Sequence, residues 1–271
     1  MYSSGVVEKG RRVLVTGGTS GIGLGACVQL AREGHVVAVN GLPGDEEGRD
    51  AALAAVDAAG EEGGLGGGAA GYVPGMLGSP DVAGEVVACA EEVLGGGVEV
   101  LVNNAGIQHV APVHEFPLDM WDKVIAVNLS APFHLTRAVL PAMREAEFGR
   151  IVNVASAHGL VASPFKAAYV AAKHGLLGFS KSTALEVAEL GITVNSVCPG
   201  YVLTPLVEAQ IPDTAAARNI SEDEVRAILL QAQPTRTFVT IQEVADAVSF
   251  LVRAPSITGT TISVDGGWTA Q

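Results

Sequence analysis

The sequence predicts an α/β fold in which a doubly wound parallel sheet of about seven strands has helices on both faces. Three observations lead to this prediction. Short runs rich in Val and Ile alternate along the chain with longer segments of helical pattern. A glycine-rich turn follows the first run and precedes a helical segment. The 271 residues are 48% hydrophobic, which is enough to bury a large core in a single domain covering residues 1–271.

Six runs have the continuous apolar character of strands that are buried on both faces. They cover residues 13–16, 36–40, 98–102, 151–155, 193–197 and 261–264. Residues 72–73 are a weaker candidate, which would be the third strand in chain order. The segments between the runs are expected to form helices at residues 22–33, 50–59, 81–94, 118–144, 167–190 and 241–253.

Two long segments interrupt this alternation. Residues 60–78 contain nine glycines, and we interpret them as a flexible, solvated surface insertion around the third strand. A functional loop is the alternative, although no residue there indicates a specific chemistry. Residues 199–236 show short helical patterns at 204–210 and 221–231, so we predict a small helical lid over a substrate site.

Charge and cysteine content limit the function classes. Sixteen Lys and Arg residues against 29 Asp and Glu residues give a net charge of −13, which argues against binding to nucleic acid or an anionic membrane. Cys27, Cys89 and Cys198 have no metal-ligand spacing, so we expect reduced, buried thiols and no metal site. Residues 1–12 are polar and no apolar run is long enough for a membrane span, so we expect a cytoplasmic protein.

The turn after the first strand has the spacing Gly-x-x-x-Gly-x-Gly. Glycines let the backbone approach a pyrophosphate closely, and the following helix N-terminus offers free N–H groups and the positive end of the helix dipole. A dinucleotide site of Rossmann type is therefore predicted, against the simpler alternative of a plain glycine turn. Its predicted contacts here are Gly17, Thr19, Ser20, Gly21, Ile22 and Gly23.

The end of the second strand bears on the choice of cofactor. It reads Asn40-Gly41, with neither an acidic residue for a ribose hydroxyl nor an arginine for a 2′-phosphate. A 2′-phosphate would also meet the acidic stretch at residues 45–47. Repulsion therefore favours NAD over NADP. Residues 74–77 lack the acidic residue that often contacts adenine in such sites.

Tyr169 and Lys173 are four residues apart in a helical segment, so their side chains lie on one face. An ammonium about 5 Å from the phenol would favour the phenolate by roughly 3 kcal/mol, or about two pKa units. We therefore expect the pKa of Tyr169 to approach the working pH, where general acid–base catalysis is efficient. The alternative is a coincidental pair on a surface helix.

The chain resembles the short-chain dehydrogenase/reductase family over residues 11–267. Five features carry the resemblance: the glycine turn, Asn103-Asn104-Ala105-Gly106, Ser156, the Tyr169/Lys173 pair and Pro199-Gly200. The resemblance implies a catalytic set of Asn128, Ser156, Tyr169 and Lys173. It implies that Tyr169 exchanges the substrate proton, that Ser156 holds the substrate oxygen, and that Asn128 supports a water chain to Lys173. It also implies further cofactor contacts at Asn104, Ala105, Gly106, Tyr169, Lys173, Pro199, Gly200, Val202 and Thr204.

Four polar side chains near this set are expected to bind a carboxylate: Gln108, His158, Lys166 and Gln210. Several charge-assisted donors around one ammonium suit the acid group of a small hydroxy or keto acid. Each also has a structural interpretation: Gln108 as a solvated loop residue, His158 as a supporting histidine, Lys166 as a surface charge and Gln210 as a surface residue of the lid. Tyr201 and Trp268 are expected to border the substrate together with Ser156 and Tyr169, although Trp268 is also a candidate for core packing.

Together with these expectations, the resemblance implies an NAD-dependent oxidoreductase that interconverts (R)-3-hydroxybutyrate and acetoacetate. The resemblance also implies a tryptophan beside the substrate methyl, where this sequence has the smaller Tyr201, which would admit a slightly longer acid. One alternative is a short-chain reductase that acts on another 3-hydroxy or 3-oxo acid, or that reduces 3-oxoacyl groups on an acidic carrier protein with NADPH. Another is a nucleotide-binding regulatory protein without turnover. The resemblance further implies a homotetramer built on helices 118–144 and 167–190 and on the C-terminal strand and tail.

Overall fold

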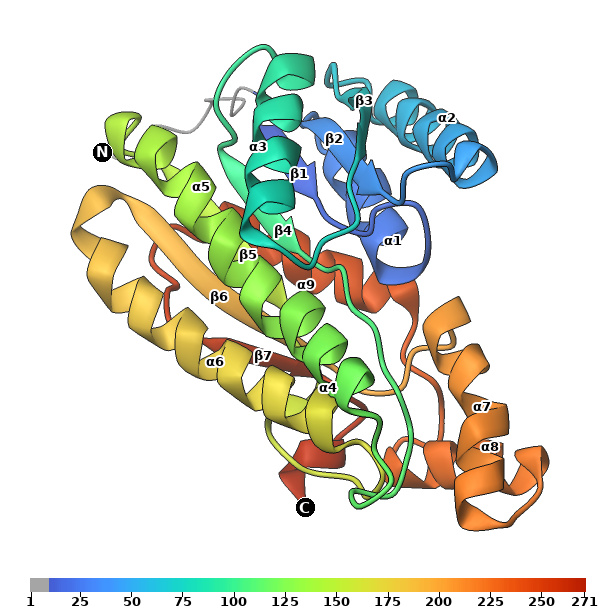
Figure 1. The fold of residues 1–271 in the computed structure, drawn as a ribbon. Helices are drawn as coiled ribbons and strands as arrows, with labels where there is room; N and C mark the ends of the chain where they lie inside the picture. The colour runs from blue at the N-terminus through green and yellow to red at the C-terminus, as the bar shows by residue number, and fades with distance from the viewer. Residues whose placement is uncertain (1–9) are drawn as a thin grey trace.

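Seven strands form one parallel sheet in the computed structural model of the protein, which describes residues 10–271 (Figure 1). Their order is β3-β2-β1-β4-β5-β6-β7, and every neighbouring pair is parallel. The chain thus winds outward from β1 in one direction and from β4 in the other, which confirms the predicted fold class. The strands are β1 (Arg12–Val15), β2 (Val36–Gly41), β3 (Gly68–Pro74), β4 (Val100–Asn103), β5 (Gly149–Val154), β6 (Ile192–Pro199) and β7 (Thr261–Val264).

Helices cover both faces of the sheet, with α1, α2 and α9 on one face and α3, α5 and α6 on the other. In β1, Val13 and Val15 belong to the first core and Leu14 to the second, because side chains alternate between the faces of a strand. This two-sided burial explains the continuous apolar runs of the sequence. The helices are α1 (Gly21–Arg32), α2 (Glu46–Gly63), α3 (Pro80–Leu94), α4 (Leu118–Ile125), α5 (Ala131–Glu145), α6 (Ala167–Val187), α7 (Pro205–Arg218), α8 (Glu222–Ala232) and α9 (Ile241–Arg253).

The predicted helix at residues 118–144 is divided by a π-helical turn, Ala126–Ser130. Asn128 lies in this turn and is fully buried. Its Nδ2 donates to the carbonyl of Val124 at 2.9 Å and to that of Ile107 at 2.8 Å. A side-chain amide that bonds to a carbonyl of its own helix and to another segment is a recognised cause of such a break.

The glycine-rich stretch at residues 60–78 is not the loose insertion that we expected. It contains the last turn of α2 and the whole of β3, which pairs with β2 along its length. A Cβ on Gly60 would lie 2.2 Å from the carbonyl oxygen of Gly67, and one on Gly63 would lie 2.0 Å from that of Arg32. These glycines allow backbone segments to touch, so composition alone misled the prediction.

The segment after β6 contains two helices, α7 and α8, where two short helical patterns were predicted. They share a small apolar core with Tyr201 and Trp268, separate from the two cores of the sheet. In Figure 1 they project beyond the carboxyl ends of the strands as an orange hairpin. This is the position expected of a lid.

Other expectations concern the chain as a whole. Residues 1–9, which include most of the segment searched for a signal peptide, lie outside the described residues. Within residues 10–271, no helix has the length and apolar composition that crossing a membrane requires.

Cys27 and Cys198 are buried free thiols, but Cys89 is only half-buried, contrary to expectation.

Two helical glycines provide a test of the packing at α2. Gly60→Ala should lower the free energy of unfolding by about 1–3 kcal/mol, because the added methyl overlaps the Gly67 carbonyl. Gly84→Ala in α3 should raise it by about 1 kcal/mol, because Gly84 is exposed and an added Cβ meets no atom within 4 Å. Urea unfolding of both variants measures the contrast. Equal changes in the free energy of unfolding would mean that backbone contact is not the reason for glycine at position 60.

Candidate active site

The turn after β1 brings the chain into α1 with the helix N-terminus facing a cleft. A Cβ on Gly23 would lie 2.1 Å from the carbonyl oxygen of Gly17, so the turn is too tight for a side chain there. Ser20 is the N-cap residue of α1 but makes no side-chain capping bond, and the first helical turn has no acidic residue. Nothing in this turn competes with an anion for the helix N-terminus, which fits a pyrophosphate.

The cleft at this turn has a volume of about 830 Å³, within the usual range for a bound small molecule. It extends from the glycine turn past the ends of β2 and β3 to α4. Among the predicted cofactor contacts, it is lined by Gly17, Thr19, Ser20, Gly21, Ile22, Asn104, Ala105, Gly106 and Thr204.

Asn104 holds the glycine turn in place. Its Nδ2 donates to the carbonyls of Thr16 at 2.9 Å and of Gly17 at 3.1 Å. The Thr16 hydroxyl in turn accepts from the backbone N–H groups of Asn104 and Ala105, both at 3.0 Å. The segment after β4 is thus tied to the turn after β1, at the point where the strand order reverses.

The end of β2 carries no free polar group for a 2′-phosphate. Asn40 is buried, and its Nδ2 donates to the carbonyl of Val73 at 2.9 Å, so its side chain is structural. Asp45 caps α2 by accepting from the Gly48 N–H at 3.0 Å. The nearest guanidinium groups are already paired, Arg49 with Asp50 at 2.8 Å and Arg32 with Glu62 at 3.3 Å.

Ser156, Tyr169 and Lys173 line one pocket at the carboxyl ends of β5 and β6. Ser156 follows β5, and its hydroxyl accepts from the His158 backbone N–H at 3.1 Å. Tyr169 and Lys173 lie on α6, and the Lys173 Nζ donates to the Val154 carbonyl at 2.8 Å. That ammonium is 5.6 Å from the centre of the Tyr169 ring. Pro199, Gly200, Val202 and Thr204 line the same pocket.

The pKa values of this pair differ from the expectation. Burial raises the pKa of Tyr169 to about 12, although a hydrogen bond with Ser156 opposes the shift. Burial also lowers the pKa of Lys173 to about 8. In the protein alone, loss of water around both groups thus outweighs the attraction between ammonium and phenolate that we had assumed.

Asn128 lies beside this pocket with an open hydrogen-bonding position. While its Nδ2 makes two bonds, its buried Oδ1 has no partner among the described residues. A buried carbonyl oxygen of this kind usually accepts from an ordered water. The arrangement is compatible with the water chain that the resemblance implied for Asn128.

An aromatic cluster lies between the pocket of Ser156, Tyr169 and Lys173 and the helices α7 and α8. The Tyr201 and Trp268 rings stack with their centres 4.8 Å apart, and the His158 ring meets Trp268 edge-on at 5.0 Å. The His158 Nε2 is 2.8 Å from the Ser163 hydroxyl, and Ser163 also hydrogen-bonds to Tyr201. Burial lowers the pKa of His158 to about 3, and the charge of Lys166 adds to this effect. His158 is therefore neutral at physiological pH.

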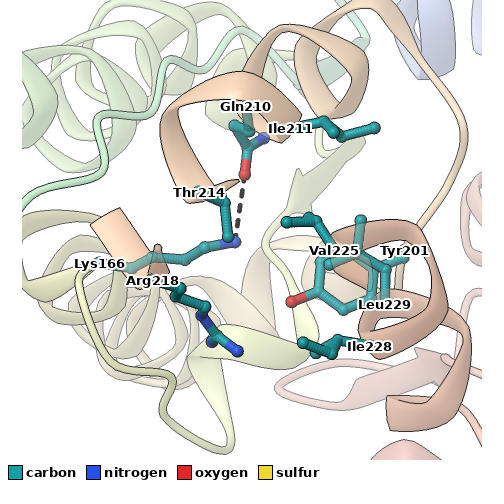
Figure 2. Close-up of a pocket in the computed structure, with 9 residues that line it drawn as sticks. All are labelled: Lys166, Tyr201, Gln210, Ile211, Thr214, Arg218, Val225, Ile228 and Leu229. Atoms are coloured by element: carbon teal, nitrogen blue, oxygen red, sulfur yellow. Dashed lines mark hydrogen bonds between the residues drawn. The ribbon is translucent and has the colours of Figure 1, made fainter. Parts of the chain in front are cut away.

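Lys166 immediately precedes α6 and is only 5% exposed. Its Nζ donates to the Oε1 of Gln210 on the lid helix α7 at 3.1 Å (Figure 2). Burial lowers the pKa of Lys166 to about 8, and the nearby positive charge of Arg218 contributes. Two of the four expected carboxylate-binding residues therefore meet directly.

Gln108, like His158, forms no hydrogen bond to another member of the expected set in residues 10–271. The Nε2 of Gln108 is buried and has no hydrogen-bond partner there. A buried amide donor without a partner is unfavourable unless a ligand or a water accepts from it.

Sequence reasoning missed residues that shape the site from behind. The Gln233 side chain is fully buried, and its Oε1 accepts from the Tyr201 backbone N–H at 2.8 Å. Asp265 accepts from the backbone N–H groups of Gly267 at 3.0 Å and Thr269 at 2.9 Å, which fixes the turn that carries Trp268. The Asp-Gly-Gly sequence before Trp268 indicated a turn, but nothing in the sequence indicated the role of Gln233.

Comparison with known proteins identifies relatives along almost the whole chain. A family model described as short chain dehydrogenase matches residues 11–215. A D-beta-hydroxybutyrate dehydrogenase of Rhizobium meliloti (strain 1021) is 48% identical over 264 residues, which cover 96% of this chain and 99% of the relative. A protein of the same name from Cupriavidus necator is 46% identical over 265 residues, covering 97% and 99%.

Among solved structures, an actinorhodin polyketide ketoreductase with NADPH has a TM-score of 0.88 at 35% identity. The match covers 97% of this chain and 98% of the ketoreductase.

The Asp265 turn provides a test of how the aromatic cluster is held. In a Trp121→Phe background, Asp265→Ala should increase acrylamide quenching of Trp268 fluorescence and lower stability by about 1–3 kcal/mol, because three hydrogen bonds to Asp265 are lost. Asp246→Ala removes an exposed carboxylate on α9 and serves as the control. Unchanged quenching in Asp265→Ala would show that the turn does not position Trp268.

Proposed function

This chain belongs to the short-chain dehydrogenase family, and we propose that it is an NAD-dependent oxidoreductase that interconverts (R)-3-hydroxybutyrate and acetoacetate. The observation that carries the proposal is the buried ammonium of Lys166, which makes no ion pair with any carboxylate among the described residues. Burying an unpaired charge is unfavourable, and an anionic substrate would relieve that cost. Lys166 lies three residues before Tyr169, so the anion would be close to the reacting group.

The relatives support the same substrate class. Two proteins that share 46–48% of their residues with this chain are named D-beta-hydroxybutyrate dehydrogenases. We propose that Gln108, His158, Lys166 and Gln210 bind the acid group, as the sequence suggested. The unpartnered Nε2 of Gln108 and the contact between Lys166 and Gln210 favour these roles. We propose that Tyr201 and Trp268 enclose the rest of the substrate, on the side of His158.

Tyr169 is proposed to accept the hydroxyl proton on oxidation and to return it on reduction, while Ser156 donates to the substrate oxygen. Bound nicotinamide dinucleotide would accept a hydride from the substrate carbon, so proton and hydride leave by separate routes. A pKa of about 12 keeps Tyr169 protonated in the protein alone, which is the form that reduction requires. Oxidation requires the phenolate, which the Lys173 ammonium stabilises. Asn128 is proposed to hold water beside Lys173.

For the cofactor, we propose NAD. The family uses NAD(H) or NADP(H), and the residues around the glycine turn and Asn104 would hold the dinucleotide by its phosphates. At the end of β2, Asp45, Glu46 and Glu47 lie at the start of α2, and the nearest arginines are paired. No arginine among the described residues lines the cleft, so a 2′-phosphate would approach these carboxylates without a guanidinium to bind it.

Each alternative function makes a different prediction. A reductase of carrier-bound substrates would need NADPH and a basic docking surface, which the net charge of −13 disfavours. A regulatory protein without turnover would not need Ser156, Tyr169 and Lys173 to meet in one pocket, as they do.

We further propose that the chain is one oxidoreductase domain, active as a cytoplasmic homotetramer. The exposed faces of α5 and α6 carry Phe133 and Leu185, which are 46% and 83% exposed and could pack between subunits. The lid is proposed to span residues 199–236.

The direct test is the initial rate of NAD⁺ reduction with (R)-3-hydroxybutyrate, with its S enantiomer and with (R)-3-hydroxyvalerate. R-selective turnover with NAD⁺ and at least about tenfold lower kcat/KM with NADP⁺ are expected. The smaller Tyr201 in place of tryptophan should allow substantial turnover of the valerate. No turnover with any of the three acids would contradict the substrate proposal, and faster turnover with NADP⁺ would contradict the cofactor proposal.

Tyr169→Phe should reduce kcat by about 10²–10⁴-fold, the usual contribution of a general acid–base group. NADH affinity, measured by fluorescence titration, should change little, because only the phenol oxygen is removed. Tyr72→Phe removes a phenol that donates to the Leu42 carbonyl at 2.7 Å, outside the catalytic pocket, and is the matched control. Loss of NADH binding with turnover, or retention of both, would remove Tyr169 from its proposed role.

A further inference from the structure

A second cationic side chain lies beside Lys166, on the lid. Arg218 is the last residue of α7, and it lines the same small cavity as Lys166, Tyr201 and Gln210. Figure 2 shows the Lys166 ammonium and the Arg218 guanidinium extending from the same side of the view toward this cavity, with the Tyr201 hydroxyl facing them. No pattern in the sequence singled out Arg218.

The Arg218 side chain lacks hydrogen-bond and ion-pair partners among the described residues. Its buried Nε makes no hydrogen bond among the described residues, and its side chain forms no ion pair there. Among the described residues, the Phe165 ring lies near the guanidinium, with its centre 6.0 Å away. A guanidinium presents several donors in a plane that matches a carboxylate. The guanidinium is therefore suited to bind an anion in this cavity.

The lining of the cavity suits an anion. Its volume of about 20 Å³ is room for little more than one water-sized group, such as one oxygen of a carboxylate. Lys166, Gln210, Thr214 and Arg218 supply polar groups on one side. The opposite wall is apolar and comes from α7 and α8, through Ile211, Val225, Ile228 and Leu229. Such a wall excludes water and strengthens the attraction between an anion and the two cations.

We propose that Arg218 is a second carboxylate-binding residue, which holds the acid group of the substrate together with Lys166 and Gln210. Lys166 belongs to the body of the protein and Arg218 to the lid, so a carboxylate between them joins the two. The acid group thereby selects the substrate and fixes α7 over the catalytic pocket. This inference rests on the proposed function, because it extends the same substrate site.

The titration of Lys166 supports this geometry. The charged and polar groups around its ammonium are Gln210 and Arg218 on α7, His158 before α6, and Tyr201 after β6. The pKa of Lys166 is lowered first by burial and then by the positive charge of Arg218. A bound carboxylate raises the pKa of Lys166 and so keeps its ammonium charged.

The test compares Arg218→Gln with Arg226→Gln and Arg218→Lys. Arg226 is a half-buried arginine on α8 that does not line the cavity, so its variant changes the net charge of the lid equally. Two quantities are measured in each variant: the KM for (R)-3-hydroxybutyrate, and the Kd of sodium butyrate for the enzyme with NAD⁺, by calorimetry. Butyrate has the carboxylate but no hydroxyl to oxidise, so its binding is measured without turnover.

Arg218→Gln should raise both the KM and the butyrate Kd by roughly 10- to 100-fold, the usual effect of removing a charged hydrogen-bond partner. Arg226→Gln should leave both within about twofold, and Arg218→Lys should give an intermediate effect. The alkaline limit of kcat/KM should move to higher pH in Arg218→Gln, because the pKa of Lys166 rises when the neighbouring charge is removed.

Three results would overturn the inference: an unchanged butyrate Kd in Arg218→Gln, an equal increase in Arg226→Gln, or no detectable butyrate binding to the parent enzyme. Failure of the proposed function gives a different result. In that case the parent oxidises none of the three hydroxy acids, while butyrate binding still depends on Arg218. Unchanged NADH affinity and thermal unfolding in Arg218→Gln show that the variant is folded.

Discussion

The arrangement of the active end depends on two ammonium groups buried on either side of Tyr169. Lys173 donates to the carbonyl of Val154 and Lys166 to the amide oxygen of Gln210. Burial lowers the pKa of both to about 8. Within residues 10–271, neither ammonium forms an ion pair with a carboxylate, although the net charge of the chain is −13. The proposed site uses this uncompensated positive charge to bind an anion.

A hydrogen-bonded frame behind the pocket keeps these groups in place. Asn104 and Thr16 join the loops after β1 and β4, and Asn128 joins the π-helical turn to the segment at Ile107. On the lid side, Gln233 fixes the backbone of Tyr201. All of these are uncharged side chains that bond to backbone groups. They add rigidity without adding a charge that would compete with a ligand.

The sheet and α6 could be predicted from the sequence, because Val-rich runs and the Tyr169/Lys173 spacing are local signals. β3 was predicted at two of its residues only, since Gly68, Gly71 and the alanines between them have low strand propensity and pair through tertiary contact with β2. The break at Asn128 depends on a carbonyl 21 residues away in the chain. The pKa of Tyr169 was predicted in the wrong direction, because its burial is not visible in the sequence.

Arg218 illustrates the limit for the substrate site. It is 52 residues from Lys166 in the chain, at the end of a lid helix with no marked amphipathic pattern, so only the folded lid reveals that the two cations share a cavity. Lys166 and Arg218 lie on separate elements, so their charges also act on the proposed lid. In the proposed site the two like charges repel each other, and a bound carboxylate would offset that repulsion and draw the two elements together. The acid group would then provide the energy for closure, and a neutral ketone of the same size would not.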